Sequence, residues 1–249
     1  MFLKTEGLVL RETEYNDADK LLTVLTKDRG QLTLRARGVR SRSSKLKSGC
    51  QLLAYSEFTI FENRDRMTVD EAVPIELFMP MREDIEMLAL ASYMAQVTEV
   101  LSQEDEPNPA LLSLTLNSLF AISKLQKPLT LVKSVFELRA AALAGYEPLL
   151  DGCSVCGERH PERFHVSQGV LQCVDCMSFE NDGIRLPLGQ GVLAAMRYIL
   201  SCDVKKLFSF QLSSEGEKEL GVITETYLLS QLERGFFTLD FYKSLQFGV

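Results

Sequence analysis

Two Cys-x-x-Cys pairs constrain this chain more than any other feature. Cys153 and Cys156 form the first pair, and Cys173 and Cys176 form the second after a gap of sixteen residues. Each short turn aims two sulfur atoms at one point, and four thiolates arranged in this way can close a tetrahedral zinc site. We therefore predict one structural zinc ion held by these four residues, in a module that spans about residues 151–181.

Three other interpretations of the cysteines remain open. A redox Cys-x-x-Cys usually begins a helix in a strand–helix–strand unit, whereas both pairs here lie in polar, turn-rich sequence. His160 and Glu162, followed by the second pair, faintly resemble a zinc deaminase signature, but Gln172 stands where that signature has proline. The third interpretation is a loop that has lost its metal. A closed four-thiolate site, by contrast, stabilises a fold and catalyses no reaction.

Length and composition favour a globular protein of two domains. The chain has 249 residues, of which 46% are hydrophobic and 24% charged, so it can bury a sizeable core. It contains no run of eighteen apolar residues, and we expect no transmembrane helix. Its first residues carry early acids and no long apolar stretch, unlike a signal peptide. Cys50 and Cys202 stand outside the zinc pattern, which favours a reducing cytoplasm as the location.

The charges are distributed unevenly along the chain. The net charge is −7, which by itself disfavours a nucleic-acid partner. Residues 1–80, however, hold 13 Lys+Arg against 12 Asp+Glu, and no acid lies between Asp28 and Glu57. A local positive field matters more than the total charge for binding a polyanion. The cations of this window that are predicted to bind a polyanion are Arg35, Arg37, Arg40, Arg42, Lys45 and Lys47.

Residues 1–80 carry the pattern of a small barrel. In residues 31–38, Leu32 and Leu34 alternate with Thr33 and Arg35, which predicts a half-buried strand whose open face is basic. Four further stretches are rich in strand-forming residues and bounded by turns. Five short strands predict an oligonucleotide-binding (OB) fold. The predicted strands are residues 2–14, 19–26, 31–38, 52–61 and 67–73, with turns that include residues 27–30 and 62–65.

Barrels of this kind bind single strands with a basic groove and exposed aromatic side chains. The basic component is present in the sequence. For Phe58 and Phe61 we expect core packing in preference to base stacking, because phenylalanine is usually buried. The aromatic candidates as a whole are Tyr15, Tyr55, Phe58 and Phe61.

Residues 81–249 have the periodicity of a helical domain interrupted by the cysteine module. Residues 213–217 supply an N-terminal cap and early acids for one of the helices. Residues 204–210 are expected to be a linker or a short helix. The fold class is therefore α+β, with a barrel domain at 1–80 and a helical domain at 81–249. The predicted helices are residues 81–102, 108–125, 129–144, 189–200 and 216–232.

No catalytic constellation is evident. The sequence contains no Gly-x-x-x-x-Gly-Lys-Ser/Thr and no Gly-x-Ser-x-Gly. Both histidines, His160 and His165, lie in the cysteine module, so histidine-based acid–base chemistry has little support. We therefore do not expect an enzyme.

A series of short motifs follows a fixed order along nearly the whole chain. They are Thr5-x-Gly7-Leu8-Val9-Leu10, Tyr15-x-x-Ala18-Asp19-Lys20-Leu21-Leu22, Thr26-x-x-x-Gly30, Ala36-Arg37-Gly38-Val39-Arg40 with Ser44, Phe136-Glu137-Leu138-Arg139, Gly145-Tyr146-x-Pro148 and Cys153-x-x-Cys156-Gly157. In order and spacing they resemble the RecO family of bacterial recombination mediators.

The resemblance implies an OB-fold, a helical domain and, in many members, a zinc module. It also implies binding to single- and double-stranded DNA and annealing of complementary strands. The implied protein partners are RecR and the acidic C-terminal tail of the single-stranded-DNA-binding protein SSB, so that RecA can load. No membrane partner and no enzymatic activity are implied, and the implied location is the cytoplasm, in association with the nucleoid.

Two further points stay open at this stage. A groove for the SSB tail needs a cation for the terminal carboxylate, and Lys124, Lys133 and Arg139 are candidates. Surface solubility, or for Arg139 an internal ion pair, explains them more simply. The alternative function is a non-enzymatic protein-interaction adaptor with a structural zinc site. A DNA shift assay at moderate salt distinguishes the adaptor from a DNA-binding mediator.

Overall fold

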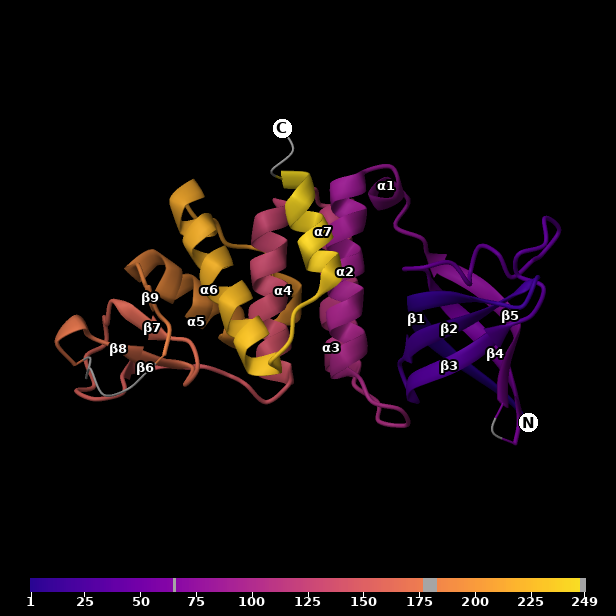
Figure 1. The fold of residues 1–249 in the computed structure, drawn as a ribbon, viewed down its shortest axis with the longest axis horizontal. Helices are drawn as coiled ribbons and strands as arrows, with labels where there is room; N and C mark the ends of the chain where they lie inside the picture. The colour runs from indigo at the N-terminus through magenta and orange to yellow at the C-terminus, as the bar shows by residue number, and fades with distance from the viewer. Residues whose placement is uncertain (65, 177–182, 247–249) are drawn as a thin grey trace. The chain divides into compact units, whose positions relative to one another are not determined.

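The computed structural model describes residues 1–64, 66–176 and 183–246 (Figure 1). Asp65 of one predicted turn, and residues 177–181 of the predicted cysteine module, lie outside the described residues. By its internal contacts the chain forms two compact units, residues 1–125 with 236–249 and residues 126–235. The predicted domain boundary after residue 80 lies where the barrel strands give way to helices. As a division into domains it stays a prediction.

The first unit begins with five strands closed into a barrel, as predicted, and the strand order is β1-β2-β3-β5-β4. β1 pairs with both β2 and β4, and a register shift between Val9 and Arg11 lets this long strand bend. The parallel pairing of β3 with β5, at Arg35 and Thr68, closes the barrel. The arrangement is that of an OB-fold. The strands are β1 Phe2–Tyr15, β2 Asp19–Thr26, β3 Gly30–Ala36, β4 Tyr55–Asn63 and β5 Arg66–Glu76.

The barrel interior follows the predicted alternation of side chains. Leu32 and Leu34 are buried while Thr33 between them is exposed, so the strand prediction is confirmed. Phe58 is fully buried, as expected, but Phe61 is 39% exposed, and the expectation that it is a core residue is wrong. Successive side chains of a strand face opposite sides. Residues three positions apart on a regular strand, such as Phe58 and Phe61, therefore cannot both face the barrel core.

Helices complete the first unit. The predicted single helix over residues 81–102 is two helices, because the Asp84 side chain accepts hydrogen bonds from the N–H groups of Glu86 and Met87 and begins a new helix there. A C-terminal helix that the sequence pattern does not predict, α7, packs on α2, where the rings of Tyr93 and Phe236 meet edge to face at 5.6 Å. The helices are α1 Met79–Arg82, α2 Ile85–Leu101, α3 Pro109–Ser123 and α7 Phe237–Gln246.

The second unit combines three helices with a small four-stranded sheet of order β6-β8-β7-β9. Phe164 of this sheet is fully buried, and its ring contacts Tyr227 of α6 at 5.2 Å. Ser213 caps α6 as predicted, and residues 204–206 form a short 3-10 helix. No helix in the described ranges of either unit has the length and apolarity to cross a membrane. The elements are α4 Leu129–Leu143, β6 Leu149–Cys153, β7 Arg163–His165, β8 Val170–Gln172, β9 Arg185–Pro187, α5 Gln190–Ser201 and α6 Ser214–Leu232.

Candidate nucleic-acid surface and metal centre

The six cations predicted to bind DNA lie on one continuous segment of the barrel. Arg35 belongs to β3, and the other five lie in the turns that connect β3 to β4. Val39 and Cys50 from these turns are buried in the barrel core, and Leu46 packs against it, so the connection is anchored to the barrel. The exposed side chains are Arg37, Arg40, Arg42, Lys45 and Lys47.

Arg35 differs from the prediction of an open basic face. Its guanidinium donates two hydrogen bonds to Asp19 Oδ2, at 2.8 and 2.6 Å, and lies over the ring of Tyr15. The other oxygen of Asp19 accepts a hydrogen bond from the Gly38 N–H at 2.7 Å. Asp19 therefore offsets the charge of Arg35 and fixes the start of the basic turns. The partner could not be recognised from sequence, because sixteen residues separate the two side chains and only the pairing of β2 with β3 brings them together.

This contact predicts a pH dependence of stability. The Gly38 N–H and the Arg35 guanidinium lower the pKa of Asp19 below its ordinary value of 3.8. A carboxyl group with a lowered pKa stabilises the fold above the unfolded-state pKa, and this contribution is lost as pH falls through the folded-state pKa. We expect the pH dependence of the unfolding free energy below pH 3.8 to be shallower in Asp19→Asn than in the wild type, as measured by urea titrations. Equal slopes in the two proteins would contradict this role.

Three of the five exposed cations line two cavities of the barrel surface. Arg40 and Lys47 line a cavity of about 430 Å³ together with Glu12 and Glu14, and Arg40 lies 3.2 Å from a carboxylate oxygen of Glu14. Arg37 lines a separate cavity of about 670 Å³, which we call the aromatic cavity. Within the described part of the chain, no ion pair involves Arg37, Arg42, Lys45 or Lys47. The aromatic cavity is lined by Phe2, Arg37, Leu46, Phe61, Asn63, Arg66, Thr68, Val69 and Asp70.

Periodicity does not single out Phe2 or Arg66 of the aromatic cavity. Phe2 is the second residue of the chain, and its neighbour Phe61 is its cross-strand partner in the β1–β4 pairing. Arg66 begins β5 beyond a turn. The folded structure, and not the sequence pattern, brings these side chains into one cavity with Arg37.

The three cations considered for the SSB tail all have partners within the protein. Lys124 lies 3.4 Å from a carboxylate oxygen of Glu76. Lys133 is buried in α4 and pairs with two carboxylates. Arg139 donates hydrogen bonds to the backbone carbonyls of Leu200 and Cys202. Surface solubility is therefore wrong for the buried Lys133, and the expected partner of Arg139 is a pair of backbone carbonyls and not an acid.

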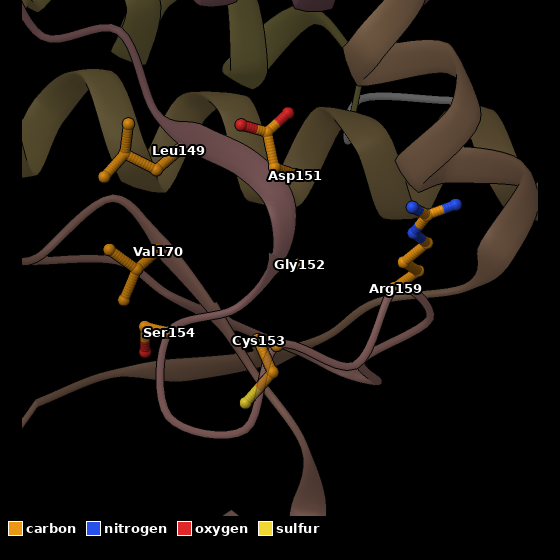
Figure 2. Close-up of a pocket in the computed structure, with 8 residues that line it drawn as sticks. Leu149, Asp151, Gly152, Cys153, Ser154, Arg159 and Val170 are labelled. Carbon is orange, nitrogen blue, oxygen red and sulfur yellow. The ribbon is translucent and has the colours of Figure 1, made fainter.

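The four cysteines form a single cluster in the second unit. Their Sγ atoms all lie within 4.8 Å of one another, and those of Cys156 and Cys173 are 3.7 Å apart. Cys153 ends β6 beside a cavity of about 430 Å³ (Figure 2). The parallel pairing of β6 with β8 places it opposite Leu171, two residues before Cys173. Gly157 closes the first turn with φ +76, a conformation that side chains disfavour, and its N–H bonds the Cys153 carbonyl.

The surroundings of Cys153 favour its thiolate. Burial acts to raise its pKa, but hydrogen bonds from the N–H groups of Cys156, Val155 and Cys173 outweigh burial and lower the pKa to about 6. A hydrogen bond with Cys156, together with burial, raises the pKa of Cys176 to about 11. Thiolates packed this closely repel one another, so a cation between them is needed if all four are to ionise.

The cluster fits a divalent metal with tetrahedral thiolate ligands. With Zn–S distances of about 2.3 Å, sulfur atoms at the corners of a tetrahedron are about 3.8 Å apart, close to the observed Cys156–Cys173 separation. The four cysteines alone make up the donor group found among the described residues, and the exposed His160 is not part of it. Four protein ligands leave no open position for a substrate, so the arrangement supports a structural site and disfavours the deaminase interpretation.

Comparisons with known proteins match both the barrel region and the helical region of the chain to one family. The family model described as "Recombination protein O N terminal" matches residues 1–78, and the model described as "Recombination protein O C terminal" matches residues 82–240. Proteins called DNA repair protein RecO are similar over most of their length. The relative from Acetivibrio thermocellus is 36% identical over 98% of this chain and 97% of its own. The relative from Thermoanaerobacter sp. is 31% identical over 98% of both chains, and one from Listeria monocytogenes is 30% identical over 90% of this chain and 87% of its own. The chain therefore belongs to the RecO family of DNA repair proteins.

Proposed function

We propose that this chain is a non-enzymatic recombination mediator that binds single- and double-stranded DNA and anneals complementary strands. In this proposal it acts with RecR and the C-terminal tail of SSB, and it helps RecA load onto SSB-coated DNA in the cytoplasm, at the nucleoid. The family membership supports the repair role. The observation that carries DNA binding is a group of exposed cations on one segment of the barrel that form no ion pair with any residue the structure describes: Arg37, Arg42, Lys45 and Lys47.

Such a group suits a polyanion better than a protein surface. A cation without an internal partner keeps its full charge for a phosphate, and each phosphate that it neutralises releases a condensed counterion. Arg35 and Arg40 belong to the proposed DNA-binding set as well, but Asp19 and Glu14 offset their charges. We therefore expect them to contribute less to the salt dependence than the unpaired four.

The first test is a salt titration of single-stranded DNA affinity. Replacing Arg37, Arg42, Lys45 and Lys47 together by alanine is expected to reduce the magnitude of the log–log salt slope by up to about 2.8, because each phosphate contact on a single strand contributes about 0.7. The matched control replaces four cations of the second unit, Arg159, Lys205, Lys206 and Lys218. An unchanged slope in the barrel variant, or an equal reduction in the control, would place the DNA elsewhere.

The second test measures the proposed reaction. Complementary oligonucleotides coated with SSB are mixed with and without the protein, and duplex formation is followed over time. We expect faster annealing with the wild type than with the four-alanine barrel variant. A protein that neither accelerates annealing nor shifts DNA at moderate salt would instead be the protein-interaction adaptor.

We also propose that the cysteine cluster holds one zinc ion through Cys153, Cys156, Cys173 and Cys176. Cysteine thiolates and a tetrahedral arrangement select zinc among the common divalent ions. When bound, the ion supplies structural cross-linking and no chemistry. The residues of the cluster hold the turns of the second unit together, and the barrel carries the DNA.

A further inference from the structure

The aromatic cavity has a composition that DNA-backbone binding alone does not explain. We infer, resting on the proposed function, that it is a base-stacking subsite for unpaired nucleotides. In this subsite one base stacks on the Phe2–Phe61 pair while Arg37 and Arg66 hold the adjacent phosphates. The subsite would distinguish single-stranded from double-stranded DNA.

The aromatic pair is available to a ligand. The Phe2 and Phe61 ring centroids are 5.0 Å apart with the ring planes inclined by 52°, and the residues are 60% and 39% exposed. The barrel core does not need them, because Phe58 and Ile60 of the same strand already fill it. An exposed pair of aromatic rings presents π faces to solvent, and every base can stack on such a face whatever its sequence.

The charges beside the rings suit a nucleotide. Two guanidinium groups, from Arg37 and Arg66, line the same cavity, and no ion pair with either is found in the ranges that the structure describes. One carboxylate, that of Asp70, lines it as well, so the cations are in the majority. Asn63 adds an amide that can bond a base edge. A cavity with apolar walls, a few convergent polar groups and a volume between about 300 and 1,000 Å³ is typical of small-ligand sites.

The geometry selects unpaired strands for a physical reason. In a duplex both faces of each base are already stacked on neighbouring bases, so a side chain reaches a face only after unstacking it at a cost of a few kcal/mol. A flexible single strand can turn one base onto the aromatic pair without that cost. The phosphate contacts, in contrast, are available in both forms of DNA. The rings should therefore affect single-strand binding alone, and the arginines should affect both.

The first experiment compares three DNA probes with the full chain. We expect Phe2→Ala/Phe61→Ala to weaken binding of an oligothymidylate by about 5- to 150-fold, the range that corresponds to loss of one base–aromatic stack. Affinity for an abasic strand of equal length, and for a duplex, should stay unchanged. The matched control is Phe237→Ala, which removes a 73% exposed ring elsewhere in the first unit.

The outcomes separate this inference from the proposed function. A wild type that binds none of the probes overturns the proposed function and the inference with it. If the wild type and Phe2→Ala/Phe61→Ala bind oligothymidylate equally tightly, the inference alone is overturned. Equal losses on all three probes also overturn it, because they would mean that the rings act through the fold and not through bases.

A second variant keeps the test valid if the alanine protein is unstable. The sequence contains no tryptophan, so Phe61→Trp creates a single fluorescent reporter that retains a stacking face. We expect oligothymidylate to quench its fluorescence and the abasic strand to bind without quenching. Phe237→Trp should respond to neither strand. Equal quenching by both strands, or no quenching by either while the DNA binds, would contradict base stacking at this cavity.

Discussion

Removal of the proposed zinc ion from the four-cysteine cluster is expected to unfold residues 149–176 while the barrel remains folded. The strands of this region that follow β6 are three residues long, too short to hold one another without a further constraint. Apparent zinc-binding free energies of roughly 10–16 kcal/mol in small modules exceed the stability of such a sheet. The measurement is hydrogen exchange of the full chain before and after chelation, with protection lost in residues 149–176 and retained in β1–β5.

The matching variants are Cys153→Ser and Cys202→Ser. The first removes a ligand, and we expect the zinc content to fall from one ion per chain towards none, with the same loss of protection as chelation. The second replaces a cysteine that lies outside the cluster, and its zinc content should match the wild type. If Cys153→Ser kept its metal, one cysteine pair would be dispensable, as the deaminase interpretation requires. If the metal-free module stayed protected, the cluster would have no structural role.

The cysteine cluster could be predicted from sequence because its geometry is local. Two residues between the cysteines of each pair fix one turn, and the turn fixes where both sulfur atoms point. The positions of Leu32 and Leu34 in the barrel core were predictable for a similar reason, since side chains alternate with a period of two along any strand. Features that depend only on near neighbours in the chain can be predicted from the sequence alone.

The parts that could not be predicted depend on register and packing. The sheet of the second unit has three-residue strands, which are too short to show a period, and pairs Leu149 with Val170 across twenty-one positions. α7 follows a short loop and is held by Phe236 against α2, a contact that no local pattern specifies. The prediction for Phe61 failed for another reason, because composition was given more weight than the alternation that already placed Phe58 inside.

The same distinction applies to the candidate DNA surface. The absence of acids between residues 28 and 57 is visible in the sequence, and it marks the segment that carries the exposed cations. The sequence does not show which of the cations form ion pairs, because Asp19 and Glu14 reach Arg35 and Arg40 from other strands. A local count of charges therefore finds the segment but overstates its field.

The second large expected effect is on stability, and it comes from a buried network of charged side chains in the second unit. Lys133 of α4 lies 2.8 Å from Glu137 and 2.7 Å from Glu225 of α6, and Thr224 donates a hydrogen bond to Glu137. The Glu137 side chain is completely buried, and that of Lys133 is 8% exposed. Burial acts to lower the pKa of Lys133, but the two carboxylates outweigh it and raise the pKa, so the ammonium group is retained. The network joins the two helices through charges that are each costly to leave unpaired.

Replacing Lys133 by methionine is therefore expected to lower the free energy of unfolding of the second unit by about 3–5 kcal/mol, because Glu137 keeps its burial and loses its cation. The measurement is hydrogen exchange of α4 and α6 under native conditions, with urea unfolding as a second readout. Lys218→Met on the exposed face of α6 is the control, and we expect it to change stability by less than about 0.5 kcal/mol. Adding Glu137→Met to Lys133→Met should restore much of the loss, since the buried carboxylate that lost its cation is then gone. A single variant as stable as the wild type, or a double variant no more stable than the single one, would contradict this role of the network.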